Sequence, residues 1–155
     1  RPKYLCKDNS STESAMLHAL KIFNNEQDTM IKNIILLQPT SPFRDHQDII
    51  NSIKKFETGK YNSLLSVYES KFFLWTLRKK RSFLPLNYNL KKRVRGQNMK
   101  FFFIENGAIF IFKYKNFLKI KNRLFKPIGY SKMSKKNSLE IDSREDFLLA
   151  KSLKN

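Results

Sequence analysis

The chain has 155 residues, of which 41% are hydrophobic, so it is long and apolar enough for one domain with its own core. No apolar run approaches the roughly 20 residues that a membrane-spanning helix needs, so no membrane partner is expected. Cys6 is the single cysteine, which excludes an internal disulfide and a zinc site built from cysteines.

The formal net charge is +18, and it has two interpretations. Such a charge suits binding to nucleic acid through phosphate neutralisation. It also follows from an AT-rich coding sequence, which enriches Lys, Asn, Ile and Phe together. The lysines are scattered along the chain, and the densest basic segments are residues 77–81 and 90–96. This distribution favours the compositional explanation and makes nucleic acid the less favoured partner.

The first half of the chain predicts a helix, a strand and a second helix. Residues 11–25 carry apolar side chains at helical spacing, next to serines that can cap the helix. Residues 33–38, NIILLQ, form a continuous apolar run, which predicts a strand covered on both faces. Asp45 and Asp48 then resemble a capping arrangement for a helix that Gly59 would end.

The second half repeats the alternation of strand and helix. Residues 62–70 and 71–79 predict strands, and about 71–105 predict an excursion or dimerisation subdomain within a single domain of residues 1–155. The remaining expected elements are a strand, a short helix, an edge strand and a final helix, at residues 106–114, 115–125, 126–133 and 143–155. The alternation predicts an α/β fold with a mostly parallel sheet.

The junction after the first apolar strand, residues 38–42 (QPTSP), combines two prolines with three side chains that form hydrogen bonds. In open α/β sheets, ligands bind beyond the carboxyl ends of the strands. The Gln38 amide offers both a donor and an acceptor to a base or a sugar, and the prolines would hold the turn rigid before a ligand arrives. An ordinary strand-to-helix turn with capping side chains would explain the same residues.

Four segments together resemble the acylneuraminate cytidylyltransferase family, which comprises the CMP-sialic acid synthetases and related enzymes for other nonulosonic acids. The most specific segment is LLQPTSPFR, at residues 36–44. The others occur in the family's order and spacing at residues 1–20, 95–112 and 140–153. The resemblance covers nearly the whole chain. It implies a Rossmann-like nucleotidyltransferase fold of the nucleotide-diphospho-sugar transferase type.

The resemblance also implies a reaction in which the anomeric hydroxyl of a nonulosonic acid attacks the α-phosphate of CTP. Magnesium assists, and a CMP-sugar and pyrophosphate result. Glu140 and Asp142 would be the catalytic and metal-binding pair, because residues two apart in an extended segment point the same way. Asp142 is the favoured direct ligand. From the residues alone, the simpler interpretation is two solvated carboxylates before a helix, with Asp142 near its N-terminus.

By the same resemblance, a further set of residues would surround the two substrates. Those on the nucleotide side are Arg1, Ser10, Ser11 and Gln38. Those expected at the acidic sugar are Gln38, Arg95, Gln97, Asn106 and Gly107. An arginine can hold a carboxylate with two hydrogen bonds, and the Asn-Gly pair resembles a turn that closes over the sugar. Arg95 could instead be a solvated charge in a basic segment.

One part of the family pattern is missing. The 155 residues contain no counterpart of the family's basic, glycine-containing nucleotide loop or of the strand before it. We therefore expect a sheet that lacks its first strand, and a chain that alone binds CTP weakly and turns over little. Asn98 and Phe110 stand where many relatives carry Asp and Tyr, which leaves the identity of the sugar open.

The family further implies a cytoplasmic homodimer that serves the biosynthesis of cell-surface polysaccharide. In such a dimer, residues 71–103 would reach across to the partner. Two alternatives stay open at this point: a catalytically incompetent fragment kept for scaffolding, and a basic nucleic-acid-binding module.

Overall fold

The computed structural model describes residues 2–7, 9–26, 30–78 and 82–154. Its helices are α1 (Thr12–Glu26), α2 (His46–Thr58), α3 (Tyr114–Ile120) and α4 (Arg144–Lys154), with short 3-10 turns η1 (Lys3–Leu5), η3 (Leu90–Lys92) and η4 (Gly96–Asn98). Its strands are β1 (Asn33–Leu37), β2 (Ser63–Ser70), β3 (Trp75–Arg78), β4 (Ser82–Pro85), β5 (Phe102–Lys113) and β6 (Ile128–Lys132).

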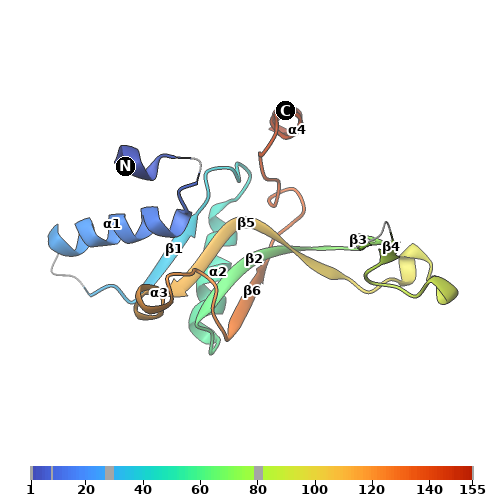
Figure 1. Cartoon of the computed structure of the whole chain (residues 1–155), viewed down its shortest axis with the longest axis horizontal. Coiled ribbons are helices and arrows are strands. Elements are labelled where there is room, and N and C mark those ends of the chain that lie inside the picture. The colour runs from blue at the N-terminus through green and yellow to red at the C-terminus, as the bar shows by residue number, and fades with distance from the viewer. Residues whose placement is uncertain (1, 8, 27–29, 79–81, 155) are drawn as a thin grey trace.

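Four strands form the central sheet, in the order β1-β5-β2-β6. β5 pairs antiparallel with both β1 and β2, whereas β2 and β6 pair parallel. Three of these strands therefore run the same way and β5 runs against them. The α/β class is confirmed, and the sheet is mixed. The long β5 lies between β1, at the edge of the sheet, and β2 (Figure 1).

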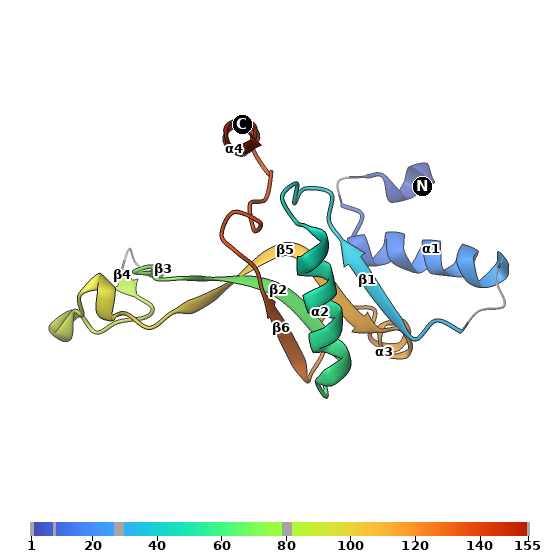
Figure 2. The same cartoon turned by 180° about the vertical axis from the view of Figure 1, so that it is seen from behind.

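Helices cover the two faces of this sheet (Figures 1 and 2). Side chains alternate along a strand, so β5 supplies both layers. On one face α2 packs against a cluster that contains Phe56, Leu64, Ala108, Ile109, Ile111 and Met133. On the other, α1 and α3 pack against Phe110, Phe112, Phe117 and Phe125. Phe110 and Phe112 are thus core residues of the α1 side.

β1 differs from its sequence-based expectation. It lies at an edge of the sheet as far as the described residues go, and only its α1 side is covered. Ile34 and Leu36 pack against the aromatic cluster under α1, whereas Ile35 and Leu37 are 41% and 38% exposed. The prediction of a strand covered on both faces is wrong, because α2 lies over β2, β5 and β6 instead.

An arm extends from one side of the sheet (Figure 1). It carries the β3–β4 hairpin, η3 and η4, between the outer ends of β2 and β5. Trp75 stacks on Phe83 with ring centroids 4.8 Å apart, and Tyr88 meets Trp75 edge-on. The sequence predicts an excursion at about residues 71–105; in the structure β4 pairs with β3 within it, and β5 already begins at Phe102.

Capping explains where two of the helices begin. The reciprocal hydrogen bonds of a capping box join Asp45 and Asp48 at the start of α2, and Gly59 ends that helix, as predicted. Ser143 and Asp146 form an equivalent box before α4. None of the helices in the described part of the chain has the length and hydropathy of a membrane span.

Candidate functional site

The site begins where β1 ends and the chain turns toward α2. Pairing of β1 with β5 stops at Leu37 and Ile109, so the chain leaves the sheet at Gln38. The Ser41 amide donates to the Gln38 carbonyl at 3.5 Å. The Ser41 hydroxyl is buried and has no hydrogen-bond partner among the described residues. A buried hydroxyl without a partner is uncommon, so this turn offers an unsatisfied polar group.

Gly107 faces this turn from β5. Its backbone φ is +64°, a conformation that glycine adopts far more easily than other residues. A Cβ at this position would lie 2.8 Å from Glu140 Oε1 and 3.0 Å from Gln38 Oε1. The missing side chain therefore lets three segments meet at one point. The structure thus brings Gln38, Gly107 and Glu140 together, and their roles toward the substrates stay predictions.

Asn106 holds β5 in this shape from inside the protein. It is 2% exposed, and its Nδ2 donates to Ser138 Oγ at 2.8 Å and to Met133 Sδ at 3.3 Å. Its Oδ1 accepts hydrogen bonds from the Ser66 hydroxyl and from the Ala108 amide. All these groups belong to the protein core, so the amide supports β5 beside Gly107 from inside the protein. The expected contact of Asn106 with the sugar stays a prediction.

Ser66 completes this internal network. The register of β2 on β5 shifts between Leu65 and Val67, next to Asn106. Ser66 Oγ accepts from the Ile109 amide at 2.8 Å and donates to Asn106. It thereby gives the Ile109 amide the hydrogen-bond partner that the irregular pairing of β2 with β5 does not supply. Ser138 in turn donates to the Ser134 carbonyl at 2.7 Å. The network therefore links β2 and β5 to the segment that leads to Glu140.

Glu140 and Asp142 approach the turn from the C-terminal segment. The Ile141 amide donates to the Thr40 carbonyl at 2.8 Å, and Thr40 Oγ1 lies 3.4 Å from Glu140 Oε1. The Asp142 amide donates to Asp146 Oδ2 at 3.2 Å, so the α4 cap fixes its backbone. Burial raises the pKa of Glu140 above its ordinary value, and the nearby Asp142 carboxylate raises it further.

The raised pKa of Glu140 predicts how stability depends on pH. A raised carboxyl pKa means that the folded chain binds this proton more tightly than the unfolded chain, so stability falls as pH rises from the ordinary Glu pKa through the folded value. Glu140→Gln should therefore raise the free energy of unfolding at pH 7 by less than about 1 kcal/mol, since solvent partly screens the group. Denaturant unfolding at pH 7 and pH 4 tests this. The gain should shrink at pH 4, and a variant less stable than wild type at pH 7 would contradict it.

A small cavity of about 240 Å³ adjoins this group of residues. It is lined by Tyr68, Ile104, Glu105, Asn106, Lys135, Ser138, Leu139 and Glu140. Lys135 is an exposed cation in this lining, whereas Glu105 and Glu140 are acidic. Asn106, which also lines the cavity, directly precedes Gly107 in β5, so the cavity lies next to the residues that meet at Gly107.

The nucleotide-side serines lie at the start of α1. Ser11 Oγ accepts the Ser14 amide at 3.1 Å and so caps the helix, and Ser10 Oγ donates to the Tyr4 carbonyl at 3.2 Å. This end of α1 lies beside the end of β1 in both views (Figures 1 and 2). Both serines thus lie near the end of β1, where Gln38 also lies. Arg1 lies outside the described residues.

Arg95 and Gln97 lie elsewhere, on the arm around η4. Both are exposed, and the Gln97 carbonyl accepts from Lys71 Nζ at 2.8 Å. The arm points away from the end of β1 (Figure 1). The structure therefore does not bring these two residues to Gln38, Gly107 and Glu140 within one chain. Spacing along the sequence gave no sign of this separation.

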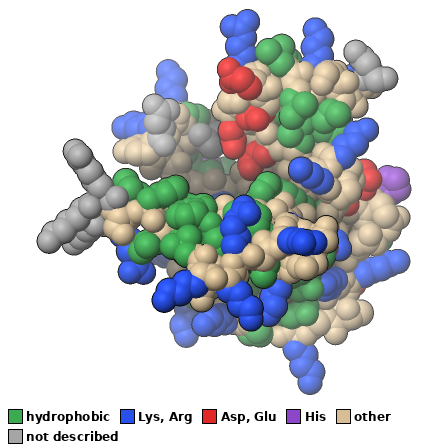
Figure 3. All heavy atoms as spheres, turned by 90° about the vertical axis from the view of Figure 1, so that its right-hand side faces the viewer, with side chains coloured by type: hydrophobic (Ala, Val, Ile, Leu, Met, Phe, Trp, Pro, Cys, Tyr) green, Lys and Arg blue, Asp and Glu red, His purple; other side chains and the backbone are tan. Residues whose placement is uncertain are grey.

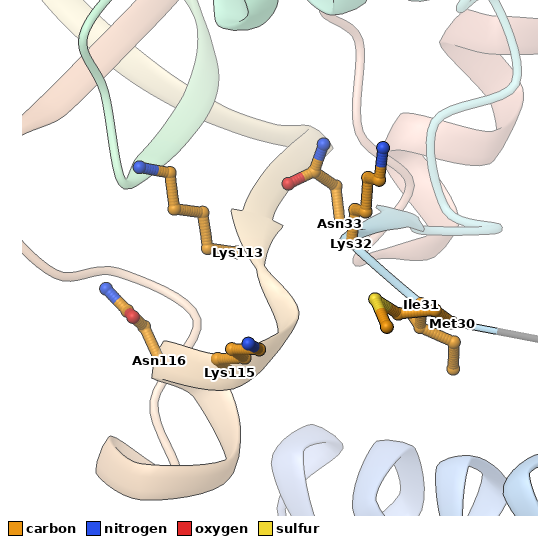
Figure 4. Close-up of a pocket in the computed structure, with 7 residues that line it drawn as sticks. All are labelled: Met30, Ile31, Lys32, Asn33, Lys113, Lys115 and Asn116. Atoms are coloured by element: carbon orange, nitrogen blue, oxygen red, sulfur yellow. The ribbon is translucent and has the colours of Figure 1, made fainter.

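A second hollow, of about 380 Å³, lies at the opposite end of β1. Its lining comes from two segments, Met30–Asn33 before and within β1 and Lys113–Asn116 at the junction of β5 and α3 (Figure 4). Three lysines surround it, at positions 32, 113 and 115. None of the predicted site residues lines it, so the lysine hollow is separate from the site at Gln38.

Sequence reasoning did not single out several residues that shape the site. Ser66, Met133 and Ser138 support Asn106, and Arg44 donates to the Gln38 carbonyl after β1 and to the Ala108 carbonyl of β5. Ser66, Met133 and Ser138 belong to none of the four motif segments, so nothing in the sequence marks them. Arg44 belongs to the LLQPTSPFR segment, so its membership in that motif was the one available signal.

Comparison with known proteins identifies the relationship. No family model matches the chain. N-acylneuraminate cytidylyltransferase from Escherichia coli O18:K1:H7 is 34% identical over 152 residues, which are 97% of this chain and 35% of that protein. By sequence, the chain is a homologue of part of that enzyme. The resemblance to the acylneuraminate cytidylyltransferases is confirmed.

Two further comparisons agree with this homology. N-acylneuraminate cytidylyltransferase from Streptococcus agalactiae serotype III is 26% identical over 119 residues, covering 76% of this chain and 29% of that protein. This cytidylyltransferase homologue thus spans about a third of the length of the curated relatives it matches. The crystal structure of 4-diphosphocytidyl-2C-methyl-D-erythritol synthase from Anaerococcus prevotii superposes with a TM-score of 0.63 at 11% identity, covering 95% of this chain and 68% of that one. This superposition shows a nucleotidyltransferase fold.

Proposed function

We propose that this chain contributes sugar-binding and metal-binding residues to a cytidylyltransferase that activates a nonulosonic acid of the sialic type. The anomeric oxygen would bond to the α-phosphorus of CTP while the α–β phosphoanhydride bond breaks, releasing pyrophosphate and the hydroxyl proton. The supporting observation is that Gln38, Gly107 and Glu140 meet at the edge of the sheet where β1 ends. The homology supplies the reaction class.

Each residue at this edge has a role that its chemistry supports. The Gln38 amide can donate to and accept from the base or the sugar, and Gly107 leaves room for a ligand to approach the backbone. Phosphoryl transfer relies mainly on positioning and charge neutralisation, so preformed polar groups suit it.

The acidic pair fits a magnesium ion. Among the residues described, no group of three or more His, Cys, Asp or Glu side chains could hold a metal. Mg²⁺ is commonly held by one or two carboxylates with substrate phosphates and water, so two acidic side chains are a sufficient protein contribution. Asp142, the favoured ligand, and Glu140 would hold it, and the ion would offset the burial and the nearby Asp142 carboxylate that together raise the pKa of Glu140. When bound, the ion would neutralise phosphate charge on CTP.

The arm supports a proposed homodimer. Hydrophobic side chains gather on the end of the arm that faces the viewer in Figure 3, with Lys and Arg around them. Exposed apolar side chains of residues 72–103 are Phe72, Leu74, Trp75, Leu77, Phe83, Leu86, Leu90, Val94, Phe101 and Phe103. A partner that covers this surface would also receive Arg95 and Gln97, which lie far from the site of their own chain.

A CTP-consuming enzyme of this kind would work in the cytoplasm.

Asp142 gives the sharpest test of the proposed chemistry. We expect Mg²⁺ with CTP to raise the thermal midpoint of the wild-type chain, and Asp142→Asn to abolish that rise while changing the midpoint without ligand by little. The reason is that the amide keeps the shape of the carboxylate but cannot bind the ion as an anion. In parallel, pyrophosphate release is measured with CTP and N-acetylneuraminic acid.

Glu57→Gln on α2 is the matched control, because this acidic residue is exposed and lies on the helix away from the turn. It should respond to Mg²⁺ and CTP as the wild type does. Equal responses of Asp142→Asn and the wild type would remove Asp142 from the metal site. CTP binding that does not depend on Mg²⁺ but weakens steeply as the salt concentration rises would favour the alternative of a basic nucleic-acid-binding module.

A further inference from the structure

We propose that Arg44 is a positioning residue that clamps the ends of β1 and β5 and so sets the distance between Gln38 and Gly107. Its Nη1 donates to the Gln38 carbonyl at 2.8 Å and to the Ala108 carbonyl at 2.9 Å. The ligand role of the clamped edge rests on the proposed function. The clamp itself is a structural claim that can be tested without it.

The clamp lies where the sheet stops. β1 and β5 pair through Leu37 and Ile109, and the next residues on the two strands are Gln38 and Ala108. Beyond this point the strands separate, and their carbonyls need a donor from outside the ladder. One guanidinium nitrogen supplies it for both strands. Hydrogen bonds from a charged donor are stronger than neutral ones, and Arg44 is half-buried, so water competes less.

Both clamped residues adjoin groups of the site. Gln38 carries the amide whose Oε1 approaches Gly107, and Ala108 directly follows Gly107 in β5. The clamp therefore acts on the short distance between the Gln38 amide and Gly107, the left-handed residue of β5. If the strands spread here, the Gln38 amide and Gly107 would move apart, although neither residue is changed.

The local chain fixes Arg44 from both sides. The prolines of residues 38–42 stiffen the turn before it, and the Arg44 amide donates to the Ser41 carbonyl at 3.4 Å. Asp45, the next residue, is the N-cap of α2, and its carboxylate also accepts from Asn137 at 3.0 Å. The backbone that carries Arg44 is thus held before the side chain reaches the strands.

Amide hydrogen exchange measures the clamp directly. We compare wild type with Arg44→Met, which keeps most of the side-chain length but removes the donors, and with Arg44→Lys, which keeps several donors on one nitrogen. Arg123→Met is the matched control. Arg123 is also half-buried, lies over the Phe110 ring at 4.6 Å and pairs with Glu13 at 3.6 Å, on the α1 side of the sheet.

Arg44→Met should speed amide exchange at residues 36–41 and 107–110 by about 10-fold to 100-fold, because that factor corresponds to the free energy that a hydrogen bond from a charged donor contributes. Residues 63–65 and 128–132, where β2 pairs with β6, should keep wild-type rates. Arg44→Lys should recover much of the protection, and its Gly107 amide resonance should lie between those of wild type and Arg44→Met. Arg123→Met should leave the exchange rates of residues 36–41 unchanged relative to those of the rest of the chain.

Uniformly faster exchange in Arg44→Met, equal in pattern to Arg123→Met, would overturn the proposal, because Arg44 would then support only global stability. If Arg44→Met does not fold, the local pattern in Arg44→Lys decides between the same two outcomes. Failure of the proposed function has a different appearance: the wild-type chain would show no response to CTP, while the exchange pattern of the variants would stand as predicted.

Discussion

Gly107→Ala is expected to lower the free energy of unfolding by about 1–3 kcal/mol, because φ at this residue is +64° and a side chain is strained there. The added methyl carbon would also come within 2.8 Å of Glu140 Oε1 and 3.0 Å of Gln38 Oε1. Both side chains would have to move, and they are the ones proposed to meet the substrates. Loss of the CTP response should therefore exceed what the lost stability alone explains.

Gly96→Ala is the matched control for this variant. Gly96 lies on the arm, and an added Cβ would meet no atom within 4 Å. Denaturant unfolding of both variants, with the thermal response to Mg²⁺ and CTP, completes the comparison. A Gly107→Ala protein as stable and as responsive as Gly96→Ala would show that neither the backbone conformation nor the approach of the two side chains matters.

Asn106→Ala is expected to cost about 3 kcal/mol, since it removes a buried amide and takes one hydrogen bond from each of the buried Ser66 and Ser138 hydroxyls. The second expected effect is local. Ser138 lies on the segment that leads to Glu140, so losing its link to β5 should let that segment move. The pKa of Glu140, followed by carboxyl carbon resonances, should then fall toward its ordinary value as the group becomes more exposed.

Asn122→Ala is the control, because this amide is exposed and accepts one local hydrogen bond from the Leu124 backbone at 2.9 Å. Its cost should stay below about 1 kcal/mol. A full-strength CTP response in a well-folded Asn106→Ala protein would mean that the buried network is not needed to shape the site. A pKa of Glu140 unchanged by the loss of Asn106 would show that the network does not position that carboxylate.

The sequence predicts the elements of this fold better than their arrangement. Helical spacing located α1, and the Asp45 and Asp48 pair located the start of α2, because capping depends on residues close in sequence. The direction of β5 depends on its partners β1 and β2, which are far away along the chain. For the same reason, an apolar run could not reveal that β1 lies at an edge with Ile35 exposed.

The site shows the same limit. Gln38, Gly107 and Glu140 could be named because they belong to short motifs of the family. That Gln38 and Glu140 would meet over the missing side chain of Gly107 required the fold. Asn106 belongs to the same motif as Gly107, yet the register shift in β2 turns its side chain into the core.

Amide chemical shifts of the chain, recorded during titration with CTP and Mg²⁺ and then with N-acetylneuraminic acid, test the central claim most directly. The account predicts that the shifts concentrate at Gln38, at Gly107 and at residues 139–143, and that those of residues 139–143 require Mg²⁺. Addition of the sugar should extend them to the cavity beside Glu140. Shifts confined to the basic arm or to the lysine hollow beside Lys32 and Lys113, and indifferent to Mg²⁺, would contradict it.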